Sequence, residues 1–344
     1  MNEWKAINTT ALREYVVSVF GAVGMQEDNA AVMADVIVRC TMYHRGHHDA
    51  GFIPNMVGQI AAGKAPANPQ ITCTASHAAI ESWDGDNGLG PICCTKAMER
   101  AMELAQEYGM GMCCMRRTNH FLAAGPYVEL AASQGFIGLI LAKGGVTMGA
   151  PGHPGACMSA LPMGFAYPTQ QEPVMLDACM AYASMEKLRV MGREEKAAPS
   201  WWGYGKDGQP SEDPLDILAG TRLPIGGHKG FGLAMLGEVL TGVLSDGCIM
   251  DEKTTEDGAV GATSHTAIAI KADALMDADT FCRRAGSVGV RASELSEGLH
   301  IPGQGAAKQV SLALERGTIM LGEAQYLKLN ELAAEYGVKL LDAI

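Results

Sequence analysis

The sequence of 344 residues predicts an enzyme-like fold of the α/β or α+β class. Hydrophobic residues make up 48% of the chain and charged residues 19%, which is typical of a globular protein with an ample core. The first part of the chain has helical periodicity, and after it short apolar runs alternate irregularly with helical segments. The regular β-α-β succession of a doubly wound parallel sheet is missing, so a Rossmann-type fold is not predicted.

The N-terminal part predicts helices. Residues 9–24 (TTALREYVVSVFGAVG) have helical spacing, with Thr9 or Thr10 as a candidate N-cap. A second helix is expected over residues 28–44 and a third, short one over residues 54–64. The proline-rich segment APANPQ then ends this helical region.

The rest of the chain mixes strands with helices. The segment QITCTASHAAIESWDGDNGLG predicts short strands and a turn. It is followed by alternating helices and strands as far as FIGLILAKGG, which predicts a buried strand. Residues 145–168 are rich in glycine and proline and predict a long loop. Residues 173–191 predict a strand that turns into a helix, residues 223–247 a glycine-rich loop that opens a helix, and residues 266–276 a strand before the terminal helices.

Composition narrows the classes of function. The net charge of −12 and the pI near 5.2 argue against binding of a nucleic-acid backbone as the main function. The ten cysteines form no CxxC pair and mostly lie in apolar runs such as GMGMCCM, which predicts reduced core thiols and a cytoplasmic protein. The first residues lack the apolar region of a signal peptide, and no apolar run is long enough to span a membrane.

The segment MYHRGHHDAG, residues 42–51, gathers histidines at the end of the second predicted helix. His44 and His48 have the i, i+4 spacing of a metal site, but Gly46 between them breaks the helix. Apart from Asp49 no third ligand has an evident spacing, so no metal site is predicted. Arg45 and protonated histidines attract carboxylates, which favours proton transfer and anion binding here.

Other segments also carry candidate chemistry. In GGHKGFG, the backbone N–H groups at a helix start and Lys229 can hold a phosphate, or the loop simply starts a helix with a solvated lysine. In RRTNHF, His120 lies at a strand end, where it can donate a proton, and Asn119 can orient it or bind substrate. Asp177 in VMLDAC is either a helix N-cap or a ligand of sugar hydroxyls.

Several of these segments, in this order along the chain, resemble one family. The stretches WDGDNGLG, TNHFLAAGPYVELAASQGFIGL, PVMLDACM, DGQPSEDP and LPIGGHKGFGLAMLGEVLTGVL resemble the malate/L-lactate dehydrogenases that are unrelated to the Rossmann-fold lactate dehydrogenases. That family includes ureidoglycolate and sulfolactate dehydrogenases, diketogulonate reductase and piperideine-2-carboxylate reductase. The similarity extends from the N-terminal helices to about Gly305.

The resemblance implies a fold and an assembly. The expected fold is α/β, with a non-Rossmann cofactor domain built on a mostly antiparallel sheet and a helical domain from the N- and C-terminal segments. Residues 1–72 with 300–344 are expected to form the helical substrate and dimer domain, and residues 73–299 the domain that binds the nicotinamide cofactor, NAD or NADP. The family is usually homodimeric, with the active site near the interface.

The resemblance also implies site residues. His120 matches the histidine of the family's Asn-His-Phe motif and His44 that of its Ser-His-Gly motif, so either histidine is expected to donate or accept the proton. The segment IPGQG resembles the family's Pro-Gly-Glu segment. The residues expected to bind the cofactor are Gly144, Asp177, Ala178, Cys179, His228, Lys229, Gly303 and Gln304.

The departures from the family pattern gather around the substrate. Where the family has Ser-His-Gly-x-x-Arg, the arginine that should hold a substrate carboxylate falls on His48, and Arg45 replaces the glycine. Two further family motifs are replaced, by Ala160-Leu161-Pro162 and by Ala142-Lys143-Gly144. The substrate pocket is therefore expected to be remodelled while the cofactor frame is kept. The residues expected to bind substrate are Tyr43, Arg45, His48, Asn119 and Arg117.

Together these features predict an NAD(P)-dependent oxidoreductase. It is expected to transfer a hydride between the nicotinamide and a small 2-hydroxy or 2-keto acid, or a related acidic ketone, with histidine as the proton donor or acceptor. The alternative within the same class is a reductase of cyclic imines such as pyrroline or piperideine carboxylates. A non-catalytic relative that binds nucleotide and a metal-dependent hydrolase built on the histidine cluster are further alternatives. The expected partners are a small acidic substrate and a second copy of the chain, without nucleic acid or membrane.

Overall fold

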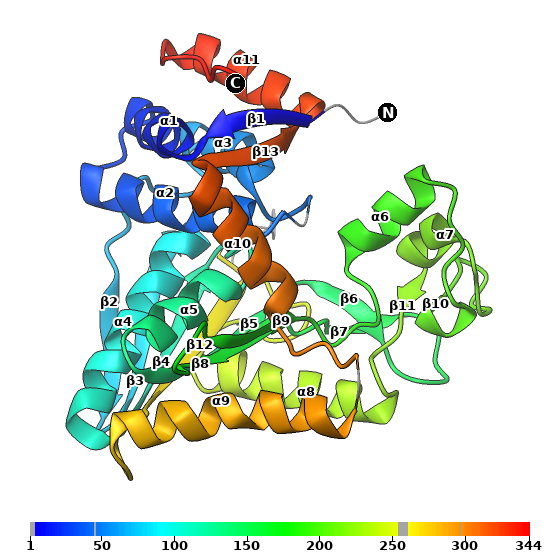
Figure 1. Ribbon diagram of the computed structural model, residues 1–344. Coiled ribbons are helices and arrows are strands. Elements are labelled where there is room, and N and C mark those ends of the chain that lie inside the picture. Colours follow the sequence, from blue (N-terminus) through cyan, green and yellow to red (C-terminus); the bar gives the residue numbers. More distant parts are fainter. Residues whose placement is uncertain (1–3, 45, 254–260, 297) are drawn as a thin grey trace.

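A computed structural model describes residues 4–44, 46–253, 261–296 and 298–344 (Figure 1). Within these residues the main sheet has seven strands in the order β2-β3-β4-β12-β5-β8-β9, in which β3 and β4 are parallel and all other neighbours antiparallel. The predicted α/β class with a mostly antiparallel sheet is therefore confirmed. The strands are β2 (Thr72–His77), β3 (Ile80–Gly88), β4 (Met110–Thr118), β5 (Phe136–Lys143), β8 (Met163–Tyr167), β9 (Val174–Ala178) and β12 (Thr263–Lys271).

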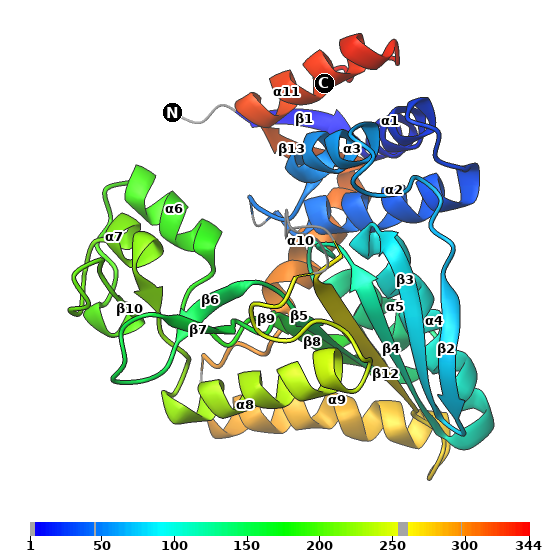
Figure 2. The ribbon, with the colours of Figure 1, turned by 180° about the vertical axis from the view of Figure 1, so that it is seen from behind.

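Helices cover both faces of this sheet (Figures 1 and 2). On one face, α4 (Gly90–Tyr108) lies so close to β4 that a side chain at Gly111 would collide with the carbonyl of Ala101. α5 (Gly125–Ser133) packs on β5 and β8 on the same face. On the other face, Cys114 and Thr266 hydrogen-bond the Leu240 carbonyl in η3 (Val239–Val243), which continues α8 (His228–Glu238). Alternate residues of each strand thus face opposite helices.

The two ends of the described chain meet in a small antiparallel pair, β1 (Trp4–Asn8) with β13 (Thr318–Gly322). Sequence analysis expected only helices here, because five-residue strands carry little periodicity of their own. The helices around this pair are α1 (Thr9–Ala22), α2 (Glu27–Met42), α3 (Ile53–Ala61), α10 (Gln304–Arg316) and α11 (Glu323–Tyr336). The N-cap of α1 is Asn8, whose side chain accepts from the N–H of Ala11 at 3.0 Å, and neither Thr9 nor Thr10.

This pairing joins two segments, within residues 1–72 and 300–344, that were expected to belong to one helical domain. One hydrophobic cluster nevertheless runs from α1 and α2 through α4 and α5 to the sheet and on to α10 and α11. The division into a helical domain and a cofactor domain, with residues 73–299 in the second, therefore stays a prediction.

A lobe stands beside the main sheet (Figure 1). It is built on a second sheet, whose described strands run in the order β10-β11-β6-β7. Its elements are β6 (Val146–Gly149), β7 (Ala156–Ser159), β10 (Gly203–Tyr204), β11 (Thr221–Arg222), the 3-10 turn η2 (Ser200–Trp202), α6 (Met185–Arg193) and α7 (Pro214–Ala219). The prediction of a long loop over residues 145–168 is wrong, because the short strands β6, β7 and β8 lie in it. Four- and five-residue strands separated by glycine and proline turns show no alternation long enough to detect.

The helix α9 (Ala278–Leu295) lies on the surface, and none of its residues is buried. A short 3-10 turn η1 (Ala50–Phe52) precedes α3. No helix among the described residues is both long and apolar enough to cross a membrane.

Candidate functional site

The described residues outline a cavity of about 1150 Å³ between the helices at the chain ends, the edge of the main sheet and the lobe. Its walls come from the turn after α2, the β4–α5 connection, the ends of β5 and β9, helix α6 and helix α11. Segments far apart in the sequence therefore meet around one space. Its volume slightly exceeds the usual range for ligand pockets, which is about 300–1,000 Å³.

His120 lines this cavity just after β4. Its ring stacks on Phe52 with centroids 5.1 Å apart and an angle of 9°, and it lies 4.9 Å from the ring of His48. Desolvation by the packed neighbours lowers the pKa of His120 to about 4, although the residue is exposed at the cavity wall. Water in the cavity weakens this desolvation, but its direction favours the neutral imidazole at neutral pH.

A backbone contact selects the tautomer of His120. The N–H of Leu122 donates to Nδ1 of His120 at 3.1 Å. Since Nδ1 accepts, the hydrogen of the neutral ring resides on Nε2. Protonation of Nδ1 would bring two N–H groups against each other, so this contact disfavours the imidazolium in the same direction as desolvation. His120 is thus set up as a neutral N–H donor.

The turn after α2 delivers His48 to the same wall. Asp49 is buried, and its carboxylate accepts from the N–H of Gly51 at 2.9 Å and from the side-chain amide of Gln325 at 3.0 Å. His48 itself has a left-handed backbone with φ of 55°, which redirects the chain. Asp49 therefore anchors the turn between α2 and α11, and the turn holds His48 beside His120.

The other residues of the histidine-rich segment lie elsewhere. The exposed ring of His44 lies 4.6 Å from that of Trp4, and His44 does not line the cavity. Tyr43 is buried, and its hydroxyl donates to Glu129 at 2.8 Å, again outside the cavity lining. Arg45 lies outside the described residues.

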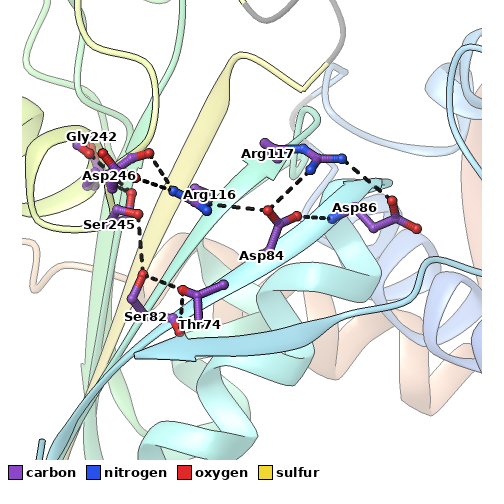
Figure 3. A network of polar contacts seen from close by, with 10 residues as sticks. Thr74, Ser82, Asp84, Asp86, Arg116, Arg117, Gly242, Ser245 and Asp246 are labelled. Carbon is purple, nitrogen blue, oxygen red and sulfur yellow. Dashed lines mark hydrogen bonds and ion pairs between the residues drawn. The ribbon is translucent and has the colours of Figure 1, made fainter. Parts of the chain in front are cut away.

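Arg117 and Asn119, two candidate substrate ligands at the end of β4, bind neighbouring segments of the protein and do not line the cavity. Arg117 reaches Asp84 at 3.3 Å and Asp86 at 3.6 Å, in a network that also contains Arg116 (Figure 3). Asn119 is buried, and its amide donates to the carbonyls of Asn87 and Gly88 at 2.6 and 3.2 Å.

The expected cofactor residues divide into two groups. Gly144 and the segment Asp177–Cys179 line the cavity, and the Asp177 carboxylate accepts from the N–H of Gly125, the first residue of α5, at 3.2 Å. The remaining four, all outside the lining, occupy the starts of two helices. His228 and Lys229 are exposed in the first turn of α8, while Gly303 lies against Met175 and Gln304 accepts from the N–H of Ile301 at the start of α10.

Sequence reasoning missed the cations of the cavity. Arg222 stands in β11 and Lys187 and Arg189 on α6, while Lys328 and Gln325 reach the cavity from α11. The charges on α6 and α11 look like solvated helix faces in the sequence, and α11 lies beyond the resemblance. Arg222 offered a signal, because it interrupts the apolar run before LPIGG.

The described residues contain no group of three or more His, Cys, Asp or Glu side chains that could hold a metal ion. The histidines near the cavity instead contact each other and aromatic rings, His47 with His48 at 4.8 Å and His48 with Phe52 at 5.6 Å.

Known proteins resemble this chain over nearly its whole length. The family model for malate/L-lactate dehydrogenase matches residues 7–330. The L-sulfolactate dehydrogenase of Methanocaldococcus jannaschii is 28% identical over 335 residues, which cover 96% of this chain and 97% of that protein. The 2,3-diketo-L-gulonate reductase of Citrobacter koseri is 30% identical over 274 residues, 78% of this chain and 81% of its own.

Solved structures agree in fold. The M. jannaschii sulfolactate dehydrogenase superimposes with a TM-score of 0.88 at 26% identity and covers 97% of this chain and 98% of its own. The delta1-piperideine-2-carboxylate reductase of Pseudomonas syringae has the same fold, with a TM-score of 0.86 at 23% identity over 96% of this chain and 100% of its own. The chain belongs to the malate/L-lactate dehydrogenase family and is an oxidoreductase.

Proposed function

We propose that this enzyme transfers a hydride between NAD(H) or NADP(H) and a small 2-hydroxy or 2-keto acid, or a related acidic ketone, in the cavity beside His120. The observation that carries the proposal is the pair His120 and His48, which meet at one wall of a cavity that also contains the segment Asp177–Cys179. When bound, the nicotinamide supplies or takes up the hydride.

The cavity fits such a cofactor. A volume of about 1150 Å³ holds a dinucleotide with a small substrate. A side chain at Gly145 would meet nothing within 4 Å, and one at Gly144 only the Ser159 hydroxyl at 3.9 Å, so the backbone there is open to a ligand. Cations on the lobe side supply charge for phosphate groups.

We assign different tasks to the two histidines. Neutral His120, with its hydrogen on Nε2, donates a hydrogen bond to the substrate oxygen and polarises the carbonyl. His48, whose ring centroid is 4.9 Å from that of His120, holds the proton that this oxygen gains on reduction or loses on oxidation. This replaces the expectation that either His120 or His44 donates or accepts the proton.

The position of His48 suggests a different register for the family's Ser-His-Gly-x-x-Arg motif. Shifted by four residues, the motif falls on His47 to Phe52, with His48 at the histidine and Phe52 at the arginine. Phe52 stacks on His120 and cannot hold a carboxylate. The acidic group of the substrate would then be held by Lys328 and Gln325, which line the same cavity.

Phe52 also favours the alternative substrate class. A flat aromatic face beside the carbon that takes the hydride suits a ring, as in a pyrroline or piperideine carboxylate, where the imine nitrogen takes the place of the carbonyl oxygen. The related reductase from P. syringae carries a name of this class. A cyclic-imine reductase therefore stays the second candidate.

A substrate panel with histidine variants tests both. Oxidation of NADH and NADPH is followed with 2-keto acids of increasing length and with cyclic imine carboxylates. His120→Ala and His48→Ala should each lower kcat by about 10²- to 10⁴-fold while cofactor binding, measured by fluorescence, is retained. His44→Ala is the matched control and should turn over like the wild type. Near wild-type turnover of His120→Ala would refute the assignment.

We also propose that the enzyme is a homodimer. Helix α8 and η3 expose a row of large apolar side chains, each about half exposed, which is unusual for a surface left in water. These are Leu233, Met235, Leu236, Val239, Val243 and Leu244. A second copy of the chain would cover them.

A further inference from the structure

Arg222 is a buried cation without a carboxylate. The residue is 6% exposed, yet it lines the cavity. Its Nε donates to the Thr147 carbonyl at 3.2 Å, Nη2 to the Thr147 hydroxyl at 2.6 Å and Nη1 to the Ala183 carbonyl at 3.1 Å. In the described part of the chain these acceptors are all neutral, so two of the five guanidinium N–H groups and the whole charge are uncompensated.

More cations surround it. Lys187, Arg189 and Arg193 on α6 line the same cavity. Glu186 pairs with Arg189 at 3.2 Å and with Arg193 at 2.9 Å. Among the described residues of this corner, four cations therefore face one carboxylate, in a protein whose net charge is −12.

The electrostatics of this corner are unfavourable without an anion. Burial lowers the pKa of Arg222; Cys179 nearby raises this pKa in part, and the positive charge of Arg189 lowers it. A buried charge that meets only neutral acceptors is destabilising, whereas the same charge stabilises a bound anion strongly. The three backbone and side-chain acceptors hold the guanidinium in place, so an anion would meet a rigid, pre-oriented fork.

We propose that Arg222 and Arg189 bind the 2′-phosphate of NADP(H), so that the enzyme prefers NADP(H) to NAD(H). This rests on the proposed function. A phosphate monoester carries a charge of about −1.5 to −2 near neutral pH, which matches the excess of cations. NAD(H) offers a hydroxyl at the same position, and Glu186, the only described carboxylate in this corner, is already paired with two arginines.

The pyrophosphate, which both cofactors share, does not need this corner. Lys229 at the start of α8 carries a charge outside this corner that can pair with it, whereas the N–H groups of Gly227 and Lys229 already donate to the carbonyls of Pro224 and Gly226 in the turn before the helix. A separate group of cations is thus left for the phosphate that only NADP(H) carries.

Equilibrium binding without substrate tests the preference. Isothermal titration measures NADPH, NADH, 2′-AMP and 5′-AMP against the wild type, Arg222→Met and Arg189→Met. The wild type should bind NADPH and 2′-AMP at least about 10-fold more tightly than NADH and 5′-AMP. Each variant should lose about 10- to 100-fold in affinity for the 2′-phosphates and little for NADH and 5′-AMP.

Arg291→Met is the matched control, since Arg291 lies on the surface helix α9 and should leave all four affinities unchanged. Arg189 is half exposed, so its variant keeps the test valid if Arg222→Met fails to fold. Equal affinities of the wild type for NADPH and NADH, or equal losses for both in the variants, would overturn the proposal in favour of a pyrophosphate contact. Binding of 2′-AMP without either dinucleotide would keep the phosphate site and overturn the proposed function.

Discussion

His265 makes the stability of this enzyme depend on pH. The residue is fully buried in β12, and desolvation, with a smaller contribution from His120, lowers its pKa to about 3. The Thr118 hydroxyl donates to the Thr263 carbonyl, so it accepts the hydrogen on Nδ1 of His265 at 2.7 Å. Nε2 has no partner in the described part of the chain. The fold therefore holds a neutral ring that cannot gain a proton without loss of stability.

The size of the effect follows from linkage. The unfolded chain protonates this histidine near pH 6.5 and the folded chain only near pH 3, so the unfolded state binds more protons between these values. Stability is then full above about pH 6.5 and falls as the pH decreases. The pH interval from 6.5 to 5 at 1.36 kcal/mol per unit gives a loss of about 2 kcal/mol between pH 7 and pH 5.

His265→Asn isolates this contribution. The asparagine amide can still donate to the Thr118 hydroxyl but does not titrate. The lost ring volume should lower the free energy of unfolding at pH 7 by about 1–3 kcal/mol. The further loss of about 2 kcal/mol on going to pH 5 should disappear.

Urea denaturation at pH 7, 6 and 5, at one protein concentration and with coincident fluorescence and circular dichroism transitions, measures both terms. His120 titrates in the same direction in both proteins, so its contribution cancels in the comparison. A variant that loses as much stability as the wild type between pH 7 and pH 5 would refute the reasoning.

Two further predictions concern an ion pair and the dimer. Glu81, whose pKa the hydrogen bond from Arg100 lowers to about 2, stabilises the fold above pH 4.5 and loses this effect as the pH falls toward 2. Glu81→Gln should thus lower the free energy of unfolding by about 1–3 kcal/mol at pH 7, and by less as the pH falls below 4.5. A difference in unfolding free energy between variant and wild type that is constant with pH in urea titrations would contradict this. If the wild type sediments as the proposed dimer, Val239→Glu should sediment as a monomer. A wild type that is already monomeric, or a variant that remains dimeric, would contradict the proposed interface.

The long helices were predictable because many residues in each of them follow the same helical hydrophobic period. The segments of α1, α2 and α4 show it over 14 to 19 residues, and Gly109 ends α4 with φ of 84°. The pairs that shape the cavity were not predictable. β1 finds its partner β13 more than 300 residues later, and no local pattern encodes such a pairing.

The candidate site was predictable where a side chain follows a regular element directly. His120 comes two residues after β4, and Asp177 lies within β9, so the end of a strand fixes both. Arg222 is different, because the sequence around this two-residue strand does not show that the cations of α6 line the same cavity. Lys328 likewise looks like a solvated helix residue in the sequence, and it lines the cavity because α11 packs against the turn of Asp49.

The two histidines His44 and His48 show why order along the chain did not identify which of them lies beside His120. Both follow the end of α2 at Met42, and both have a left-handed backbone, with φ of 51° and 55°. Neither residue continues the helix, so a period counted from the helix no longer predicts direction. The direction is decided at Asp49, whose carboxylate joins Gly51 to Gln325 of α11. A contact from α11 therefore holds the turn that places His48 beside His120, and it links the C-terminal helix to the candidate site.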